Sequence, residues 1–381
     1  MVSRAALALW LTACGASGKN DATIARPIRF LHTFSPAETE LFNQSMSENG
    51  IEIEPSLVPF ARGQQIISEI LRAGTSCPDL IRIDATWLDA LATRLTPVPA
   101  ELAHADWTAE ATSLAVRHGT WLAVPQTVDG LVVVRDAKLP APASTSLDDV
   151  VRAARAARSE TIAYPLGLRL DSYWLVPWLR AEGADLALGS GPGSGIEGDG
   201  AVHALAKFAA LFGDIAPPPP PAGSETPDEL RRWNTGEVAY WVTGPWQIGE
   251  LAGRDRIAVS PLAHAPRGGQ LLVVPACAKH PVDGWRLAGV LTSPAVEARF
   301  AEAFALVPTR TAALAEASPL VHAIDAALAD ATPLPQARAT PMLFDDLNPA
   351  VSAVVAHDAT PDEAIAGVRR GWHRLERGVV P

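Results

Sequence analysis

Short apolar segments alternate with amphipathic ones through the first third of the chain. Apolar runs at 28–32, 51–57 and 79–83 predict strands, and the segments that follow them predict helices. The first helix begins at Ser35-Pro36, which has the cap residue and the proline typical of a helix start. This βαβαβα order predicts an open, mostly parallel sheet flanked by helices.

The remainder of the chain predicts strands and helices in a less regular order. Residues 121–134 predict two short strands around Pro125 and Asp129, and the Gly/Ser-rich segment 189–200 and the prolines at 217–221 predict loops. Further strands are predicted at 238–242 and 270–275, and helices at 147–157, 172–182, 201–211, 285–291 and 295–304 and from 228. The Ala-rich C-terminal part predicts helices interrupted at Pro308, Pro319, Pro333, Pro335, Pro341 and Pro349.

The N-terminus predicts export from the cytoplasm. A basic residue, Arg4, precedes the apolar run 5–11, and small residues then lead to Cys14. This pattern resembles a bacterial lipoprotein signal at 1–14, in which Cys14 is lipidated, and the small and polar residues of 15–26 would form a tether. The apolar run is too short to span a membrane, which takes about 20 residues. The alternative is an unmodified cysteine after a hydrophobic start.

Composition narrows the function classes. Hydrophobic residues make up 48% of the chain and charged residues only 19%, which excludes a disordered or coiled-coil protein. The net charge of -11 argues against a nucleic-acid partner. Cys77 and Cys277 could pair in an oxidising compartment, although their spacing does not show that they meet, and they are too few for a structural zinc site.

Several segments together resemble the family 1 extracellular solute-binding proteins of the maltose and trehalose type. The segments are 77–87 (CPDLIRIDATW), 119–131 (GTWLAVPQTVDGL), 236–246 (GEVAYWVTGPW), 268–274 (GGQLLVV), 337–341 (ARATP) and 360–364 (TPDEA). Each segment is weakly specific, and their order along the chain carries the resemblance. It implies a two-lobed α/β fold of the periplasmic binding-protein type, in which each lobe is a mostly parallel sheet flanked by helices.

The same resemblance implies how the lobes are assembled and what they do. Lobe 1 would comprise 27–127 and 264–309, and lobe 2 would comprise 128–263 and 310–381, with crossings near 126–130 and 261–266. Such a protein captures a mono- or oligosaccharide between its lobes and delivers it to the permease subunits of an ABC transporter. It would act as a lipid-anchored monomer in the periplasm or at the cell surface, without a cofactor or metal.

Three acidic residues are candidate acceptors for sugar hydroxyls. Asp84 follows a predicted strand, where open α/β sheets place ligands, and its alternative role is to cap the next helix. Asp129 lies at the first crossing, and its alternative role is that of a turn residue before Gly130. Glu38 lies at a helix start, where an acid also offsets the helix dipole.

Two arginines and five aromatic residues complete the predicted site. Arg62 and Arg338 could bind hydroxyls or a carboxylate, or form surface ion pairs. Trp246 is the strongest aromatic candidate because Gly244-Pro245 ends the strand before it. Trp87, Tyr173, Trp174 and Phe344 are further candidates for stacking on a sugar face, or are core residues. Gly268 and Gly269 would let the backbone approach the ligand, and Gln270 follows where sugar-binding relatives often carry Trp.

Two other function classes remain open from the sequence. Asp84 and Asp129 are the residue type of a glycosidase pair, but the sequence does not give their separation. The chain has neither a Gly-x-Ser-x-Gly nor a His-Glu-x-x-His motif. A receptor of the same fold could bind a polyamine, thiamine or a ferric ion instead of a sugar, although such a site would be rich in acids or Tyr.

Overall fold

The structure is a computed structural model, which describes residues 26–188, 195–219 and 229–378. The predicted signal with Cys14, the tether up to residue 25, and parts of the Gly/Ser-rich and proline-rich loops lie outside the described residues. Within the described part, no helix combines the length and apolar character that crossing a membrane requires.

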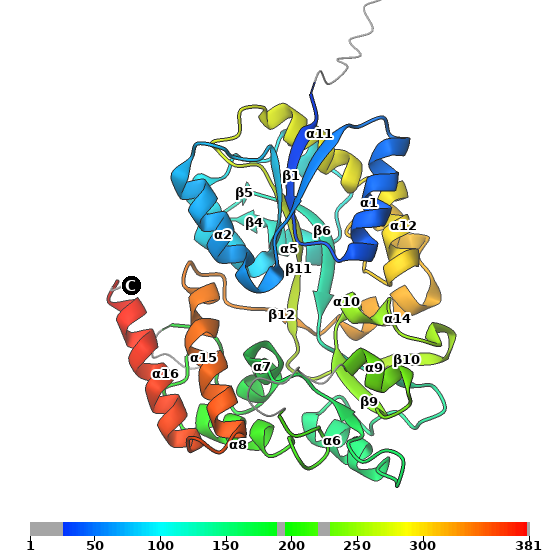
Figure 1. Ribbon diagram of the computed structural model, residues 1–381, viewed down its shortest axis with the longest axis vertical. Helices are drawn as coiled ribbons and strands as arrows, with labels where there is room; N and C mark the ends of the chain where they lie inside the picture. The colour runs from blue at the N-terminus through cyan, green and yellow to red at the C-terminus, as the bar shows by residue number, and fades with distance from the viewer. Residues whose placement is uncertain (1–25, 189–194, 220–228, 379–381) are drawn as a thin grey trace, which may run out of the picture.

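Two β-sheets lie one above the other, each with its own helices (Figure 1). The first sheet has the order β12-β11-β3-β1-β2, and β6 also pairs with β11. Its strands are β1 (Ile28–His32), β2 (Ile53–Leu57), β3 (Leu80–Asp84), β6 (Val124–Gly130), β11 (Pro266–Val273) and β12 (Thr332–Pro333). The second sheet has the order β10-β7-β9-β8, formed by β7 (Val132–Asp136), β8 (Leu166–Gly167), β9 (Tyr240–Thr243) and β10 (Ile257–Ser260). The strands β4 (Val116–Arg117) and β5 (Thr120–Trp121) form a hairpin that pairs with neither sheet.

The expected two-lobed α/β fold is confirmed, and strand direction follows from the connections between the lobes. β1 pairs in parallel with β2 and β3, as the βαβ order predicts. β6 carries the chain from the first sheet into β7 of the second, and β10 leads back into β11, so the pairs β6–β11 and β7–β10 are antiparallel. The pair β7–β9 is antiparallel as well. The second sheet is therefore mostly antiparallel, which differs from the mostly parallel sheet expected in each lobe.

Helices cover both sheets, and their starts match the sequence signals. The helices around the first sheet are α1 (Pro36–Glu48), α2 (Phe60–Ala73), α3 (Leu88–Leu91), α4 (Ala100–Ala103), α5 (Ala109–Ala115), α11 (Pro281–Leu291), α12 (Pro294–Phe304) and α13 (Thr311–Ala315), with the 3-10 turns η1 (Ala85–Trp87) and η2 (Ala92–Arg94). Those around the second are α6 (Leu147–Ala156), α7 (Ser172–Ala181), α8 (Gly200–Ala209), α9 (Glu229–Asn234), α10 (Pro245–Ile248), α14 (Pro319–Ala327), α15 (Thr340–Val355) and α16 (Pro361–Glu376), with η3 (Arg254–Arg256). Pro319 and Pro341 begin helices, whereas Pro349 lies inside α15 and does not interrupt it.

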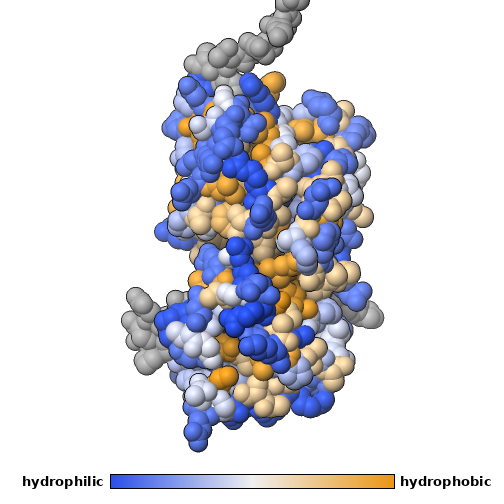
Figure 2. Space-filling model, turned by 90° about the vertical axis from the view of Figure 1, so that its right-hand side faces the viewer, coloured by the Kyte–Doolittle hydropathy of each residue, from blue (hydrophilic) through white to orange (hydrophobic). Residues whose placement is uncertain are grey.

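Each face of the first sheet has its own apolar core. Phe30, Phe42 and Trp285 belong to a cluster between the sheet and α1, α11 and α12. The opposite face contributes to a larger cluster that continues into the second lobe, where α7, α8, α15 and α16 pack together. Seen from the side of α12 and α14, polar and apolar residues are interspersed over the surface, and no single apolar patch dominates this view (Figure 2).

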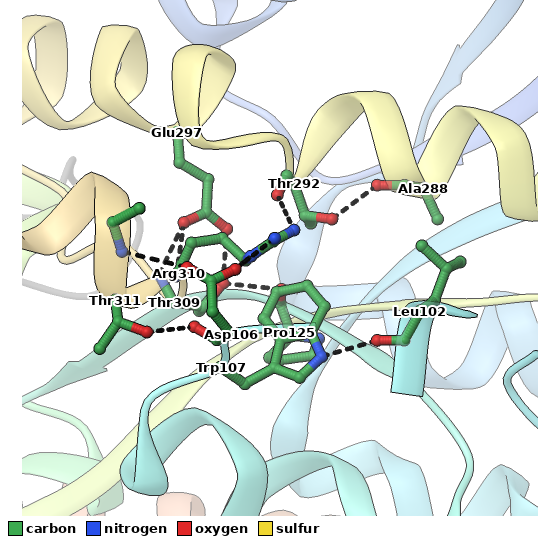
Figure 3. A network of polar contacts seen from close by, with 11 residues as sticks. Leu102, Asp106, Trp107, Pro125, Ala288, Thr292, Glu297, Thr309, Arg310 and Thr311 are labelled. Carbon is green, nitrogen blue, oxygen red and sulfur yellow. Dashed lines mark hydrogen bonds and ion pairs between the residues drawn. The ribbon is translucent and has the colours of Figure 1, made fainter. Parts of the chain in front are cut away.

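A third connection between the lobes, after α12, is fixed by a buried acid (Figure 3). Glu297 Oε2 accepts hydrogen bonds from the backbone N–H groups of Thr309, at 2.9 Å, and Arg310, at 2.8 Å. The Thr309 hydroxyl lies within hydrogen-bond distance of both Glu297 Oε1 and the Pro125 carbonyl oxygen in β6, but it has a single proton. Both hydrogen bonds can form if Glu297 is protonated, because its carboxyl group then donates to the Thr309 hydroxyl while that hydroxyl donates to the Pro125 carbonyl oxygen. Burial raises the pKa of Glu297 to about 8, which agrees with the protonated form.

Glu297→Gln should be tolerated, because the amide keeps one acceptor for the two N–H groups and one donor for Thr309. We expect its free energy of unfolding to lie within about 1 kcal/mol of the wild-type value at pH 6, whereas Glu297→Ala should lose about 2–4 kcal/mol by leaving buried donors unpaired. Urea unfolding at pH 6 measures both. Equal losses in the two variants would contradict the hydrogen-bond scheme.

Cys77 and Cys277 form a disulfide between the start of β3 and the segment after β11, with their Cα atoms 5.8 Å apart. The pairing that the sequence left open is thus present, and it closes a loop of 200 residues. It lies at the end of β3 opposite to Asp84.

Replacing both cysteines by Ser should lower the free energy of unfolding by about 2–4 kcal/mol, because the unfolded chain is no longer constrained by the loop. Urea unfolding with and without reductant measures the loss. The reductant should destabilise the wild type and leave the double variant unchanged, and a wild type indifferent to reduction would contradict the expectation.

Candidate functional site

One face of the first sheet presents polar residues where β3, β11 and β6 approach the second lobe. Gln270 of β11 lies opposite Asp84 of β3 on one side and Thr127 of β6 on the other. Two residues earlier in β11, Gly268 lies opposite Asp129 of β6. Because side chains alternate along strands, these residues share one face. The two predicted acids are thus brought to adjacent positions across β11.

Asp84 has the capping role that the sequence offered as its alternative, and its carboxylate lies on the shared face. Its Oδ1 accepts hydrogen bonds from the backbone N–H of Thr86, at 2.9 Å, and from the Thr86 hydroxyl, at 2.6 Å, as a cap of η1 does. Its Oδ2 accepts from Gln270 Nε2 at 3.2 Å. Burial raises the pKa of Asp84, and these hydrogen bonds oppose the rise. The carboxylate is therefore anchored in place on the shared face.

Asp129 lies within β6 rather than in a turn, and it is only 9% exposed. Within the described residues its carboxylate has no hydrogen-bond partner. A Cβ atom added to Gly268 would lie 2.7 Å from Asp129 Oδ1 and 3.6 Å from the Tyr173 hydroxyl oxygen. Burial and the neighbouring Asp84 together raise the pKa of Asp129 to about 8, although Arg82 acts to lower it. Asp129 is thus a buried acid at the point where the second lobe begins.

Glu38 contacts an arginine that the sequence analysis did not select. Arg82 of β3 donates from Nε to Gln126 at 2.7 Å and from Nη1 to Thr33 at 2.9 Å. Its Nη2 lies 3.7 Å from Glu38 Oε1, while Glu38 Oε2 accepts from the backbone N–H of Ser35 at 2.8 Å. Glu38 therefore caps α1 and faces Arg82.

Three aromatic residues of the second lobe meet at the same boundary. The Trp246 ring centroid lies 6.1 Å from that of Trp174 and 6.3 Å from that of Tyr173, in edge-to-face arrangements. Trp174 donates from Nε1 to the Val242 carbonyl at 2.8 Å. A Cβ on Gly244 would lie 2.2 Å from the Trp246 ring, so the glycine is required for this ring position. Tyr173 also lies near Asp129, because the Tyr173 hydroxyl oxygen and Asp129 Oδ1 are both close to the position that a Cβ atom of residue 268 would take.

A family model described as bacterial extracellular solute-binding protein matches residues 40–329. The chain belongs to this family. Its members are the solute-binding components of ABC transporters and act outside the cytoplasm, so the predicted family and the predicted solute-binding function are confirmed. A comparison with curated proteins gives no match.

Several solved structures share the fold of this chain. The GacH receptor of Streptomyces glaucescens is 23% identical with a TM-score of 0.78, over 92% of this chain and 98% of that one. The maltose-bound MalE3 of T. maritima is 18% identical with a TM-score of 0.80, over 92% and 99%. The maltose/maltodextrin-binding MalE domain of Bdellovibrio bacteriovorus is 15% identical with a TM-score of 0.78, over 92% and 100%. At these identities the likeness shows the fold.

The other predicted site residues of this solute-binding protein make different contacts. Trp87 is 6% exposed and packs against Gly63, where a Cβ would lie 2.5 Å from its ring. Arg62 and Arg338 are exposed, and no side-chain partner is seen for either within the described residues. Phe344 is half-buried on α15, which contacts η1 of the other lobe.

Gly269 is packed against the backbone of β6. A Cβ there would lie 2.2 Å from the Thr127 carbonyl oxygen, so this glycine lets β11 pair with β6. Phe60, which the sequence analysis missed, is 54% exposed and packs on Trp87 with ring centroids 5.2 Å apart. An apolar residue at a helix start gives no distinguishing signal in the sequence. Arg82 had one, since it is a charge inside an apolar strand.

The raised pKa of Asp129 predicts a pH dependence of stability. The folded protein keeps this proton up to about pH 8, whereas the unfolded chain releases it near the ordinary value of 3.8. The stabilising contribution is therefore complete below about pH 4 and is lost as pH rises through 8. The free energy of unfolding of the wild type, relative to Asp129→Asn, should fall over this range with a slope of up to about 1.4 kcal/mol per pH unit.

Urea unfolding of both proteins at several values between pH 4 and pH 8 measures this difference. Glu297, another buried acid whose pKa is raised, is present in both proteins, so its contribution cancels. A difference that does not change with pH would show that Asp129 is ionised throughout.

Proposed function

We propose that the protein captures a carbohydrate between its two lobes and delivers it to the permease subunits of an ABC transporter. The observation that carries the proposal is the meeting of two carboxyl groups of the first sheet, Asp84 and Asp129, with the aromatic cluster of Tyr173, Trp174 and Trp246 in the second lobe. Carboxylates accept hydrogen bonds from hydroxyl groups, and flat rings cover the apolar faces of a sugar.

The structural relatives support a carbohydrate ligand. The GacH receptor is described in complex with acarbose, the T. maritima MalE3 with maltose, and the B. bacteriovorus domain with maltotriose. Their folds match this chain over more than nine-tenths of its length. We carry over the class of ligand and not the individual sugar.

Binding requires the lobes to separate and close again. Asp129 and Trp174 are buried where the lobes meet, so a ligand reaches them only when the boundary opens. The segments 126–130 and 261–266 connect the lobes, and we assign lobe 1 to 27–127 and 264–309 and lobe 2 to 128–263 and 310–381. Within 310–381, α13 and β12 are exceptions, because they lie with the first sheet. A ligand held by both lobes favours the closed state, because its contacts with both exist only there.

We also propose that the predicted N-terminal signal exports the protein and attaches it to a membrane. Lipidation of Cys14 would anchor a monomer to a membrane in the periplasm or at the cell surface, with 15–26 as the tether. The protein binds its ligand without transforming it. Incubation with maltose and trehalose should return both sugars unchanged.

Trp246→Ala should weaken carbohydrate binding about tenfold or more, because a loss of about 1.4 kcal/mol from one stacking ring corresponds to that factor. Calorimetric titration with glucose, maltose, maltotriose, trehalose and cellobiose gives the affinities. The matched control is Trp233→Ala, because Trp233 packs on Trp241 outside the cluster. Unchanged binding in Trp246→Ala would refute the site, and the absence of heat with every sugar would refute the carbohydrate proposal.

A further inference from the structure

We propose that the ligand carries a protonated amino group, as an amino sugar or an amino-cyclitol does, and that Asp129 selects it. The inference rests on the proposed function and names the chemical class of its ligand. It starts from a polar group that the protein itself leaves without a partner.

The floor of the site offers acceptors that no protein donor satisfies. Asp129 is more than nine-tenths buried, and within the described residues nothing donates to its carboxylate. Gln270 Oε1, on the same face, is also buried without a partner. Asp84, by contrast, already accepts from Thr86 and Gln270. Because a buried acceptor without a donor is costly, the arrangement calls for a ligand that donates at Asp129.

Charge distinguishes an ammonium group from a hydroxyl group at this position. Arg82 is the cation that acts on Asp129, but its guanidinium already binds Gln126 and Thr33 and faces Glu38. Asp84 adds a second acid beside Asp129. Once Asp129 is ionised, the negative charges of Asp84, Asp129 and Glu38 exceed the single positive charge of Arg82. A neutral sugar supplies donors without charge, whereas an ammonium group supplies both.

The aromatic cluster suits a cation as well as a sugar face. The negative faces of Trp and Tyr rings attract cations, and the Arg169 guanidinium already lies over the Trp174 ring, 5.2 Å from its centroid. Tyr173 and Trp246 stand on the side of the boundary opposite Asp129. An ammonium group held there would contact a carboxylate on one side and aromatic rings on the other.

Binding of this kind would release a proton. Before binding, burial holds the pKa of Asp129 at about 8, so its carboxyl group is mostly neutral at pH 6.5. The titratable or charged groups that face it are Asp84 and Arg82 from β3 and Tyr173 from α7, and the adjacent residue of β11 is Gly268. When a protonated amine binds, Asp129 ionises and its proton passes to the buffer. A neutral sugar leaves that proton in place.

The test compares matched ligands by calorimetry at pH 6.5. Glucose, maltose and trehalose are each titrated beside their 2-amino-2-deoxy derivative and the N-acetyl form of that derivative, which removes the charge. We expect at least one amine to bind about tenfold or more tighter than its parent sugar, and N-acetylation to abolish the gain. Titration in two buffers of different ionisation enthalpy should show close to one proton released with the amine and none with the parent.

Asp129→Asn should reduce the ratio of amine to parent affinity to about one. The matched control, Asp330→Asn, removes an exposed acid outside the site and should keep the ratio. A preference for the amine that survives in Asp129→Asn would overturn the assignment to Asp129. If that variant does not fold, the proton count of the wild type decides, and the absence of proton release would refute the inference.

The outcomes separate this inference from the function on which it rests. If a parent sugar binds as tightly as its amine or more tightly, the amine inference is wrong and the carbohydrate receptor stands. If no sugar, amine or N-acetyl form binds, the carbohydrate receptor itself is refuted.

Discussion

Strands β6 and β11 carry the chain in opposite directions between the two lobes and pair with each other from Leu272 to Arg267. This antiparallel pair belongs to the first sheet, yet each strand continues directly into the second lobe. The face that it presents there includes Asp129, Gly268 and Gln270. The same pairing therefore connects the lobes, sets their strand directions and builds the floor of the site. Glu297 and Thr309 add to it by tying the third connection to the Pro125 carbonyl of β6.

Local signals in the sequence were sufficient for most elements of the fold. Ser35 with Glu38 caps α1 and Gly74 ends α2 in the left-handed conformation, because these signals act within one helical turn. Local signals do not determine the strand directions in the second lobe, because these depend on which strands cross between the lobes. Pro349 shows the limit of local rules: tertiary packing holds α15 together although its sequence predicts a break.

The sequence predicted which types of residue form the candidate site better than it predicted which residues lie next to one another. The structure brings Asp84, Asp129, Tyr173, Trp174 and Trp246 to one boundary, as the proposed sugar site requires, but Trp87 packs in the core of the first lobe. Both kinds of tryptophan follow strands, and the sequence does not show that Gly63 leaves room for one of them. Arg82 was missed because its role arises only when β3, β6 and the start of α1 come together around it.

The paired glycines of β11 show how the backbone prepares the site. Gly269 is needed by the fold, because the Thr127 carbonyl of β6 occupies the space of its Cβ. Gly268 faces the other way, where a side chain would come between Asp129 and Tyr173. A Cβ atom at 268 would lie only 2.7 Å from Asp129 Oδ1, so a side chain there would cover or displace the Asp129 carboxyl group. The absence of a side chain there leaves that carboxyl group uncovered. Under the proposed function, a donor from the ligand would meet it as the lobes close, which would couple recognition to closure.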